Sequence, residues 1–123
     1  MSASGQRRRR ANEAIREVIG QALLTELSDP RLEMVTITSV ETSPDLGHAR
    51  VYWTVLDPVR ADAAGAGLES ARGVLQGLVG TALGSRQTPR LQFIRDELQE
   101  KARRLTALID EVAPADDPTD AGS

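Results

Sequence analysis

Apolar residues near the start of the chain recur with the spacing of one helical face. The stripe consists of Ala11, Ile15, Val18 and Ala22. Steps of three and four residues bring such side chains onto the same side of an α-helix. Ser28-Asp29-Pro30 then interrupts the pattern, because proline disfavours helical geometry in the residue before it. We expect an amphipathic helix from Arg8 to Leu27.

Two segments with the composition of β-strands follow. Residues 35–42 read VTITSVET, which is rich in β-branched residues. Residues 49–56 read ARVYWTVL and alternate apolar with polar side chains. Residues 43–47 (SPDLG) supply turn residues between them. We predict a β-hairpin whose buried face consists of Ala49, Val51, Trp53 and Val55, and whose other face consists of Arg50, Tyr52 and Thr54.

A second helical stripe runs from Leu68 to Leu83 and is interrupted by Ala71-Arg72-Gly73. Glycine inside a helix costs about 1 kcal/mol relative to alanine, so we expect two helices separated by a break at residues 71–73. Thr88-Pro89 ends the helical pattern. The alternating residues 91–94 (LQFI) predict a third strand.

Residues 96–112 have one more amphipathic pattern and predict a final helix. Its apolar side consists of Leu98, Ala102, Leu105, Leu108 and Ile109. The segments outside these patterns lack apolar residues that could join a core. We therefore expect a disordered N-terminal arm at residues 1–7, one domain at residues 8–112 and a disordered acidic tail at residues 113–123.

The composition narrows the class of protein. A chain of 123 residues suits one domain, and the absence of cysteine excludes disulfides and thiolate metal sites. No apolar run approaches the roughly 20 residues of a membrane-spanning helix. The first residues lack the apolar core of a signal peptide. The expectation is a soluble cytoplasmic protein.

The net charge of −3 conceals local basic clusters. Three of the 18 acidic residues lie in the tail, and the remaining 15 balance the 15 basic residues. The basic residues gather at Arg7 to Arg10 and, toward the other end, at Arg86, Arg90, Arg95, Lys101, Arg103 and Arg104. Phosphate binding depends on such local patches more than on total charge.

No group of residues suited to covalent chemistry is visible. His48, the only histidine, lies in the predicted turn and has no partner at metal-ligand spacing. Neither a Ser-His-Asp set with a supporting motif nor a glycine-rich phosphate loop is present. Aromatic residues are scarce, and Trp53 and Phe93 occupy apolar strand positions. We therefore expect a protein that is not an enzyme and that binds no cofactor, metal or small-molecule substrate. We expect it to recognise nucleic acid through charge and shape.

Several motifs together resemble one known family. The Val-Thr-Ile strand, the Ser-Pro-Asp-Leu turn and the Ala-x-Val-Tyr strand occur in order. Ala71-Arg72-Gly73 fits an Ala-x-Gly break between helices, and residues 89–93 fit a Pro-x-Leu-x-Phe strand entry in which Arg90 replaces the usual acid. These motifs resemble the ribosome-binding factor A family, which is built on a type II KH-like fold. The resemblance covers Arg8 to Val112.

This resemblance implies an α+β fold of order α-β-β-α-α-β plus a C-terminal helix, with a three-stranded sheet and helices on one face. It implies a non-catalytic assembly factor that binds the free 30S small ribosomal subunit and 16S rRNA, and assists late 30S maturation and 16S rRNA processing. We expect a monomer without membrane contact. The alternative is a KH-like protein-interaction adaptor that does not bind RNA directly, which the neutral body and scarce aromatics would suit.

Gly77-Leu78-Val79-Gly80 is a literal GxxG, the sequence that forms the loop between helices in ordinary KH domains. Leu78 and Val79 continue the apolar stripe, whereas the middle residues of a KH loop are exposed. We place the break at residues 71–73, and periodicity alone leaves the other assignment open.

Arginines at the predicted junctions are the candidate RNA-binding residues. The set consists of Arg7, Arg8, Arg9, Arg10, Arg72, Arg86, Arg90 and Arg95. Arginine binds phosphate through two parallel hydrogen bonds, and the groove of a type II KH fold runs beside the break at residues 71–73. The alternative is that these side chains solubilise the surface or pair with Asp96, Glu97 and Glu100.

Overall fold

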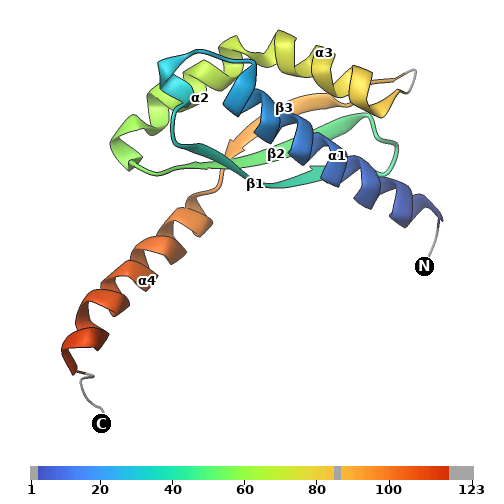
Figure 1. Cartoon of the computed structure of the whole chain (residues 1–123). Helices are drawn as coiled ribbons and strands as arrows, with labels where there is room; N and C mark the ends of the chain where they lie inside the picture. Colours follow the sequence, from blue (N-terminus) through green and yellow to red (C-terminus); the bar gives the residue numbers. More distant parts are fainter. Residues whose placement is uncertain (1–2, 85–86, 117–123) are drawn as a thin grey trace.

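The computed structural model describes residues 3–84 and 87–116 (Figure 1). Four helices and three strands alternate with two short 3-10 turns. The elements are α1 (Ala3–Thr25), η1 (Pro30–Leu32), β1 (Val35–Thr42), β2 (His48–Val55), η2 (Pro58–Arg60), α2 (Ala61–Ser70), α3 (Arg72–Leu83), β3 (Arg90–Arg95) and α4 (Glu97–Asp116). This order confirms the α+β, type II KH-like fold expected from the sequence.

The three strands form one mixed sheet in the order β1-β2-β3. β1 and β2 are the predicted antiparallel hairpin, with a register shift between Ile37 and Ser39. β2 and β3 are parallel, so His48 pairs with Arg90 at one end and Trp53 with Arg95 at the other. Figure 1 shows α1, α2 and α3 on one face of the sheet, whereas α4 projects away from the body.

The hydrophobic core lies between the sheet and α1–α3. Ile15 and Ile19 from α1, Leu68 from α2 and Leu75 from α3 are completely buried there. The predicted apolar face of β2 is confirmed, and Trp53 is only 4% exposed. The indole of Trp53 packs beneath α2 at Gly65. A Cβ atom built on Gly65 would lie 3.5 Å from Cζ2 of the indole.

The opposite face of the sheet is open except near the end of β2. Thr54 alternates onto this face as expected, yet it is buried. The start of α4 lies against this part of β2, where Arg103 Nη2 donates a hydrogen bond to the Val55 carbonyl oxygen at 3.4 Å. Sequence alternation alone predicted the face of Thr54 but not its burial.

The break between the central helices lies where the sequence predicts it. Ala71 separates α2 from α3 with φ −87° and ψ −1°. Gly73 lies inside the first turn of α3, and a Cβ atom there would meet nothing within 4 Å, so the break does not depend on the conformational freedom of this glycine. Gly77 and Gly80 are both inside α3, and the alternative placement of the break at the GxxG sequence is wrong.

The helices at the two ends are longer than expected. α1 begins at Ala3, so the residues before Arg8 that the structure describes are helical instead of a disordered arm. The strong helix propensity of arginine favours this extension. α4 continues past Val112 to Asp116. Residues 1–2 and the remainder of the predicted tail, 117–123, lie outside the described residues.

Candidate nucleic-acid interface

Side chains near the start of α1 anchor this helix to the end of β1. Arg8 Nη2 donates a hydrogen bond to the Thr42 carbonyl oxygen at 2.6 Å. Asn12 Oδ1 accepts two more, from Thr42 N at 2.9 Å and Thr42 Oγ1 at 2.8 Å. The start of α1 is therefore fixed beside the turn that joins β1 to β2 (Figure 1).

The β1–β2 turn is held by its own polar side chains. Asp45 Oδ1 accepts hydrogen bonds from Ser43 Oγ at 2.7 Å and from Gly47 N at 2.9 Å. The hydrogen bond from Ser43, followed by that from Gly47, lowers the pKa of the Asp45 carboxyl group. Gly47 O in turn accepts a hydrogen bond from Arg90 N at 2.9 Å. The start of α1, the turn and the start of β3 thus form one end of the molecule.

A small polar groove lies between the α2–α3 break and the start of β3. Its volume is 470 Å³, and its lining residues are His48, Glu69, Arg72, Arg90, Leu91 and Gln92. Gln76 closes the outer edge of β3, because its Nε2 atom donates to Pro89 O at 2.5 Å and its Oε1 atom accepts from Leu91 N at 3.2 Å. The groove lies beside the break at residues 71–73, where the family resemblance implies an RNA-binding surface.

Arg72 lies in this groove, but its guanidinium already has several partners. It forms an ion pair with Glu69 at 2.9 Å and donates a hydrogen bond to the Leu91 carbonyl oxygen. The guanidinium also lies over the Phe93 ring, 5.1 Å from its centroid. These contacts tie the α2–α3 break to β3, which gives Arg72 a role in the shape of the groove.

Arg90 and His48 are the exposed basic side chains of the groove. Among the residues that the structure describes, no ion pair involves Arg90. An exposed arginine without a carboxylate partner keeps its hydrogen-bond donors available for phosphate. Arg90 is therefore the side chain of this groove best suited to bind an anion.

The other predicted arginines lie in different places. Arg7, Arg9 and Arg10 are exposed on α1, whereas Arg8 is half-buried against β1. These four are at the same end of the molecule as Arg90. Arg86 lies outside the described residues. The α1 arginines and Arg90 thus lie at the same end of the molecule but beside different strands, β1 and β3.

Arg95 lies at the far end of β3 and points to α4. It forms an ion pair with Glu100 at 2.7 Å, and Glu100 is only 3% exposed. The hydrogen bond from Arg95 lowers the pKa of the Glu100 carboxyl group, although burial of that carboxyl opposes the change. The same hydrogen bond raises the pKa of Arg95. The geometry supports the alternative interpretation of Arg95 as a partner of a nearby carboxylate.

Sequence reasoning missed His48 and Gln92 as members of the groove. The sequence pattern assigns His48 to a surface turn, but this residue begins β2 and pairs with Arg90 across the parallel strands. Gln92 pairs with Arg50 two positions further along the same strands. Only the parallel alignment of β2 with β3 could have identified these two residues, and this alignment is not visible without the fold.

Two kinds of site are missing from the described part of the chain. Its residues hold no group of three or more His, Cys, Asp or Glu side chains that could bind a metal ion. Within the same ranges, no helix is long and apolar enough to cross a membrane. A larger, apolar groove of 1140 Å³ lies beside α1, and its lining residues include none of the predicted RNA-binding arginines.

Known proteins match nearly the whole chain. The family model for ribosome-binding factor A matches residues 7–109. Ribosome-binding factor A of Salinispora tropica is 38% identical over 109 residues, covering 88% of this chain and 70% of that relative. The crystal structure of ribosome-binding factor A from Thermus thermophilus superposes with a TM-score of 0.65 at 23% identity, over 72% of this chain and 93% of that one.

A second solved structure is a Thermus thermophilus ribosome-binding factor A fitted into a cryo-EM map of a complex with the 30S subunit. It superposes with a TM-score of 0.58 at 24% identity, over 68% of this chain and 88% of that chain. At these identities the two structures show the fold, whereas the family model and the sequence relative show descent. The chain belongs to the ribosome-binding factor A family.

Proposed function

We propose that this protein is a non-catalytic assembly factor that binds the free 30S subunit in the cytoplasm, contacts 16S rRNA, and assists late 30S maturation and 16S rRNA processing. Membership of the ribosome-binding factor A family carries the proposal. The fold it shares with a ribosome-binding factor A fitted into a 30S complex supports the choice of partner.

The RNA contact that we propose uses phosphates more than bases. Exposed aromatic rings are needed to stack on single-stranded bases, but Trp53 is in the core and Phe93 is half-buried beneath Arg72. The third aromatic residue, Tyr52, is also half-buried. Arginine donors match phosphate oxygens in geometry and charge. The protein therefore recognises the shape and the backbone of folded rRNA.

Each arginine has its own part in this proposal. Arg90 binds phosphate in the polar groove, with His48 beside it. Arg7, Arg9 and Arg10 extend the contact from the exposed surface of α1. Arg72 keeps the break and β3 in place, and its remaining exposed edge faces the groove.

Cosedimentation with purified 30S subunits at low and moderate salt tests the proposal. We expect binding to weaken steeply with salt, because each phosphate contact releases a counterion. Arg90→Glu is expected to weaken binding and to reduce the salt slope by about 1. Arg60→Glu, at the opposite end of the sheet, makes the same charge change and is expected to leave binding unchanged.

The result that contradicts RNA binding is also clear. Binding to 30S that does not respond to salt, and that Arg90→Glu leaves intact, would favour the adaptor that contacts ribosomal protein alone. In cells, replacement of the wild-type chain by the Arg90→Glu variant is expected to raise the fraction of unprocessed 16S rRNA, measured by primer extension. Normal processing with this variant would remove the proposed role of the groove in maturation.

A further inference from the structure

The helix α4 has an apolar stripe that its own domain does not cover. Leu98, Leu105, Leu108 and Ile109 are exposed by 78%, 56%, 57% and 63%. Each residue of a helix advances about 100° around the axis, so Leu105 and Ile109 lie on the opposite side of α4 from Glu100 and Arg103. Glu100 and Arg103 are the residues that touch the body. The stripe therefore faces outward.

Polar contacts fix the direction in which α4 leaves the sheet. Thr38 Oγ1 donates to Asp96 Oδ2 at 2.9 Å, and Asp96 N donates to Trp53 O at 2.7 Å. The buried ion pair between Arg95 and Glu100 adds a third attachment. For the stripe to reach the body of its own chain, these contacts would have to break and α4 would have to rotate. The stripe is thus available to another molecule.

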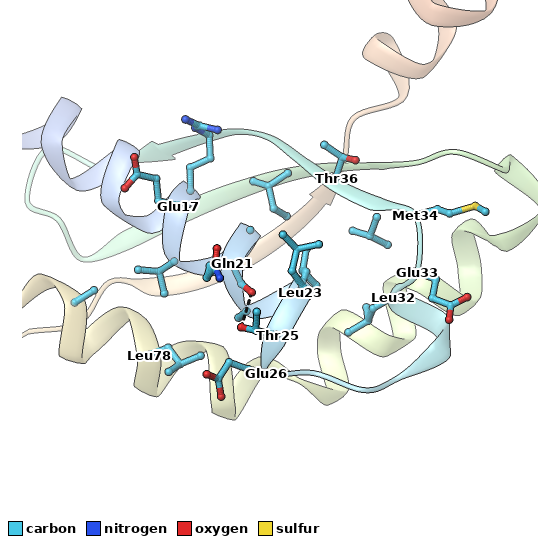
Figure 2. A pocket seen from close by; sticks show the side chains of 18 of the residues that line it. Glu17, Gln21, Leu23, Thr25, Glu26, Leu32, Glu33, Met34, Thr36 and Leu78 are labelled. Atoms are coloured by element: carbon cyan, nitrogen blue, oxygen red, sulfur yellow. Dashed lines mark hydrogen bonds between the residues drawn. The ribbon is translucent and has the colours of Figure 1, made fainter.

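The body carries an apolar groove of matching size. This groove has a volume of 1140 Å³ and lies between the second half of α1, the start of β1 and α3. Figure 2 shows Leu23, Leu32 and Leu78 within it. Along α1 it extends from Arg16 to Glu26, about 15 Å, and the α4 stripe from Leu98 to Ile109 is about 16 Å long. A groove of this form suits the side of an amphipathic helix.

The charges around the two surfaces are opposite. Glu17, Glu26 and Glu33 line the groove and are exposed, and Figure 2 shows them at separate points around it. Arg16, the basic lining residue, is already in an ion pair with Glu13. The helix α4 carries two exposed basic residues, Lys101 and Arg104, beside its stripe, and one exposed acidic residue, Glu97, on the same side, so this flank is basic on balance. An acidic groove rim and a basic helix flank are complementary.

We infer that the apolar stripe of α4 docks in the apolar groove of a second copy of this chain. The docking is reciprocal, so each copy places its α4 in the groove of the other. The groove includes Thr36, and α4 is attached to Thr38 on the same strand. The groove lies on the helix side of β1 and α4 is attached on the other side, so two copies can meet across this strand in one self-complementary interface. The sequence alone predicts a monomer. The outward stripe favours this reciprocal dimer at high protein concentration.

Sedimentation velocity of the full chain, over a wide range of protein concentration, tests the inference. We expect a reversible monomer–dimer equilibrium. The double variant Leu105→Glu/Leu108→Glu and the groove variant Leu24→Glu are each expected to raise the dissociation constant by at least about tenfold. All three leucines are exposed in the single chain, so the monomer fold is retained. Ala107→Glu, on the opposite side of α4, is the matched control and keeps the wild-type constant.

Mixing the two kinds of variant adds a second test. The stripe variant has an intact groove and the Leu24→Glu variant has an intact α4, so an equimolar mixture can form one of the two contacts. We expect association of the mixture to exceed that of either variant alone. A charge exchange, Lys101→Glu mixed with Glu26→Lys, is expected to associate better than Lys101→Glu alone.

Three results would overturn the inference. A monomer at every concentration would show that the stripe does not dock in a second copy. A dimer that Leu24→Glu leaves intact would show that α4 pairs with α4 and not with the groove. Association of Ala107→Glu as weak as that of the stripe variant would show that charge on α4, and not its apolar side, is responsible.

Discussion

Replacement of Arg72 by alanine separates a structural role for this residue from a direct role in RNA binding. The substitution removes the hydrogen bond to Leu91 O, the contact with the Phe93 ring and the ion pair with Glu69. A hydrogen bond from a charged donor contributes about 1.5 kcal/mol, a cation–π contact about 0.5–1 kcal/mol and an exposed ion pair about 0.5 kcal/mol. We expect Arg72→Ala to lower the free energy of unfolding by about 2–3 kcal/mol.

Urea denaturation followed by the fluorescence of Trp53 measures this loss directly, because Trp53 is the only tryptophan and is buried. The melting temperature is expected to fall by roughly 10–20 °C for a domain of this size. Arg72→Lys keeps the charge but loses the planar donor geometry, and we expect an intermediate loss. Arg90→Ala is the control and should change stability by less than about 0.5 kcal/mol, since the side chain is exposed.

The opposite pattern would refute this reasoning. If Arg72→Ala unfolds as the wild type does but no longer sediments with 30S subunits, Arg72 is a phosphate ligand. The contacts with Glu69 and Phe93 would then be resting positions of a side chain that is released on binding.

Three further predictions concern the core, the α4 attachment and α3. Trp53→Ala is expected to destabilise the protein by about 3–5 kcal/mol in urea denaturation followed by circular dichroism, since this variant has no tryptophan, and normal stability would show that the indole is not a core residue. The pKa of Glu100 is lower in the folded state than in the unfolded chain. The stability that its ion pair with Arg95 contributes is therefore fully present at pH values above the ordinary pKa of glutamate, and it is lost as the pH falls through the folded-state pKa. The free energy of unfolding measured against pH should therefore fall more steeply in acid for wild type than for Glu100→Gln, and equal slopes would contradict this. In α3, Gly77→Ala should stabilise the protein by about 0.5–1 kcal/mol, because a Cβ atom there meets nothing within 4 Å. Gly80→Ala should destabilise it, because a Cβ atom there would lie 2.7 Å from the hydroxyl of Thr88. Thermal melting measures both, and equal shifts in melting temperature would refute the distinction.

Local patterns in the sequence were sufficient for most of the fold. The strand β1 has the predicted bounds, β2 and β3 differ by a residue at their ends, and the break lies at Ala71 as expected. These features depend on neighbours along the chain, such as alternation in strands and the proline that follows α3. The early start of α1 at Ala3 was missed because residues 3–7 carry no apolar stripe. The bonds of Arg8 and Asn12 to Thr42, thirty or more residues away, hold the turns that follow.

The candidate site was less predictable, because its geometry depends on contacts between distant segments. Spacing could place Arg72 at the break, but it could not show that the Leu91 carbonyl and the Phe93 ring would occupy its guanidinium. Similarly, only the parallel register of β2 with β3 brings His48 beside Arg90. An arginine at a junction is visible in a sequence, whereas the availability of its charge is not.

The way in which Gln76 covers the edge of β3 limits what can enter the neighbouring groove. Its amide donates to one backbone oxygen and accepts from one backbone nitrogen, so it imitates the hydrogen bonds of an adjacent strand. An uncovered edge strand accepts extended peptides and other sheets through its backbone. At Pro89 and Leu91 these positions are already occupied, and a peptide cannot extend the sheet there. A ligand in this groove would be bound by other contacts than strand addition, and under the proposed function these are the side-chain donors of Arg90 to phosphate.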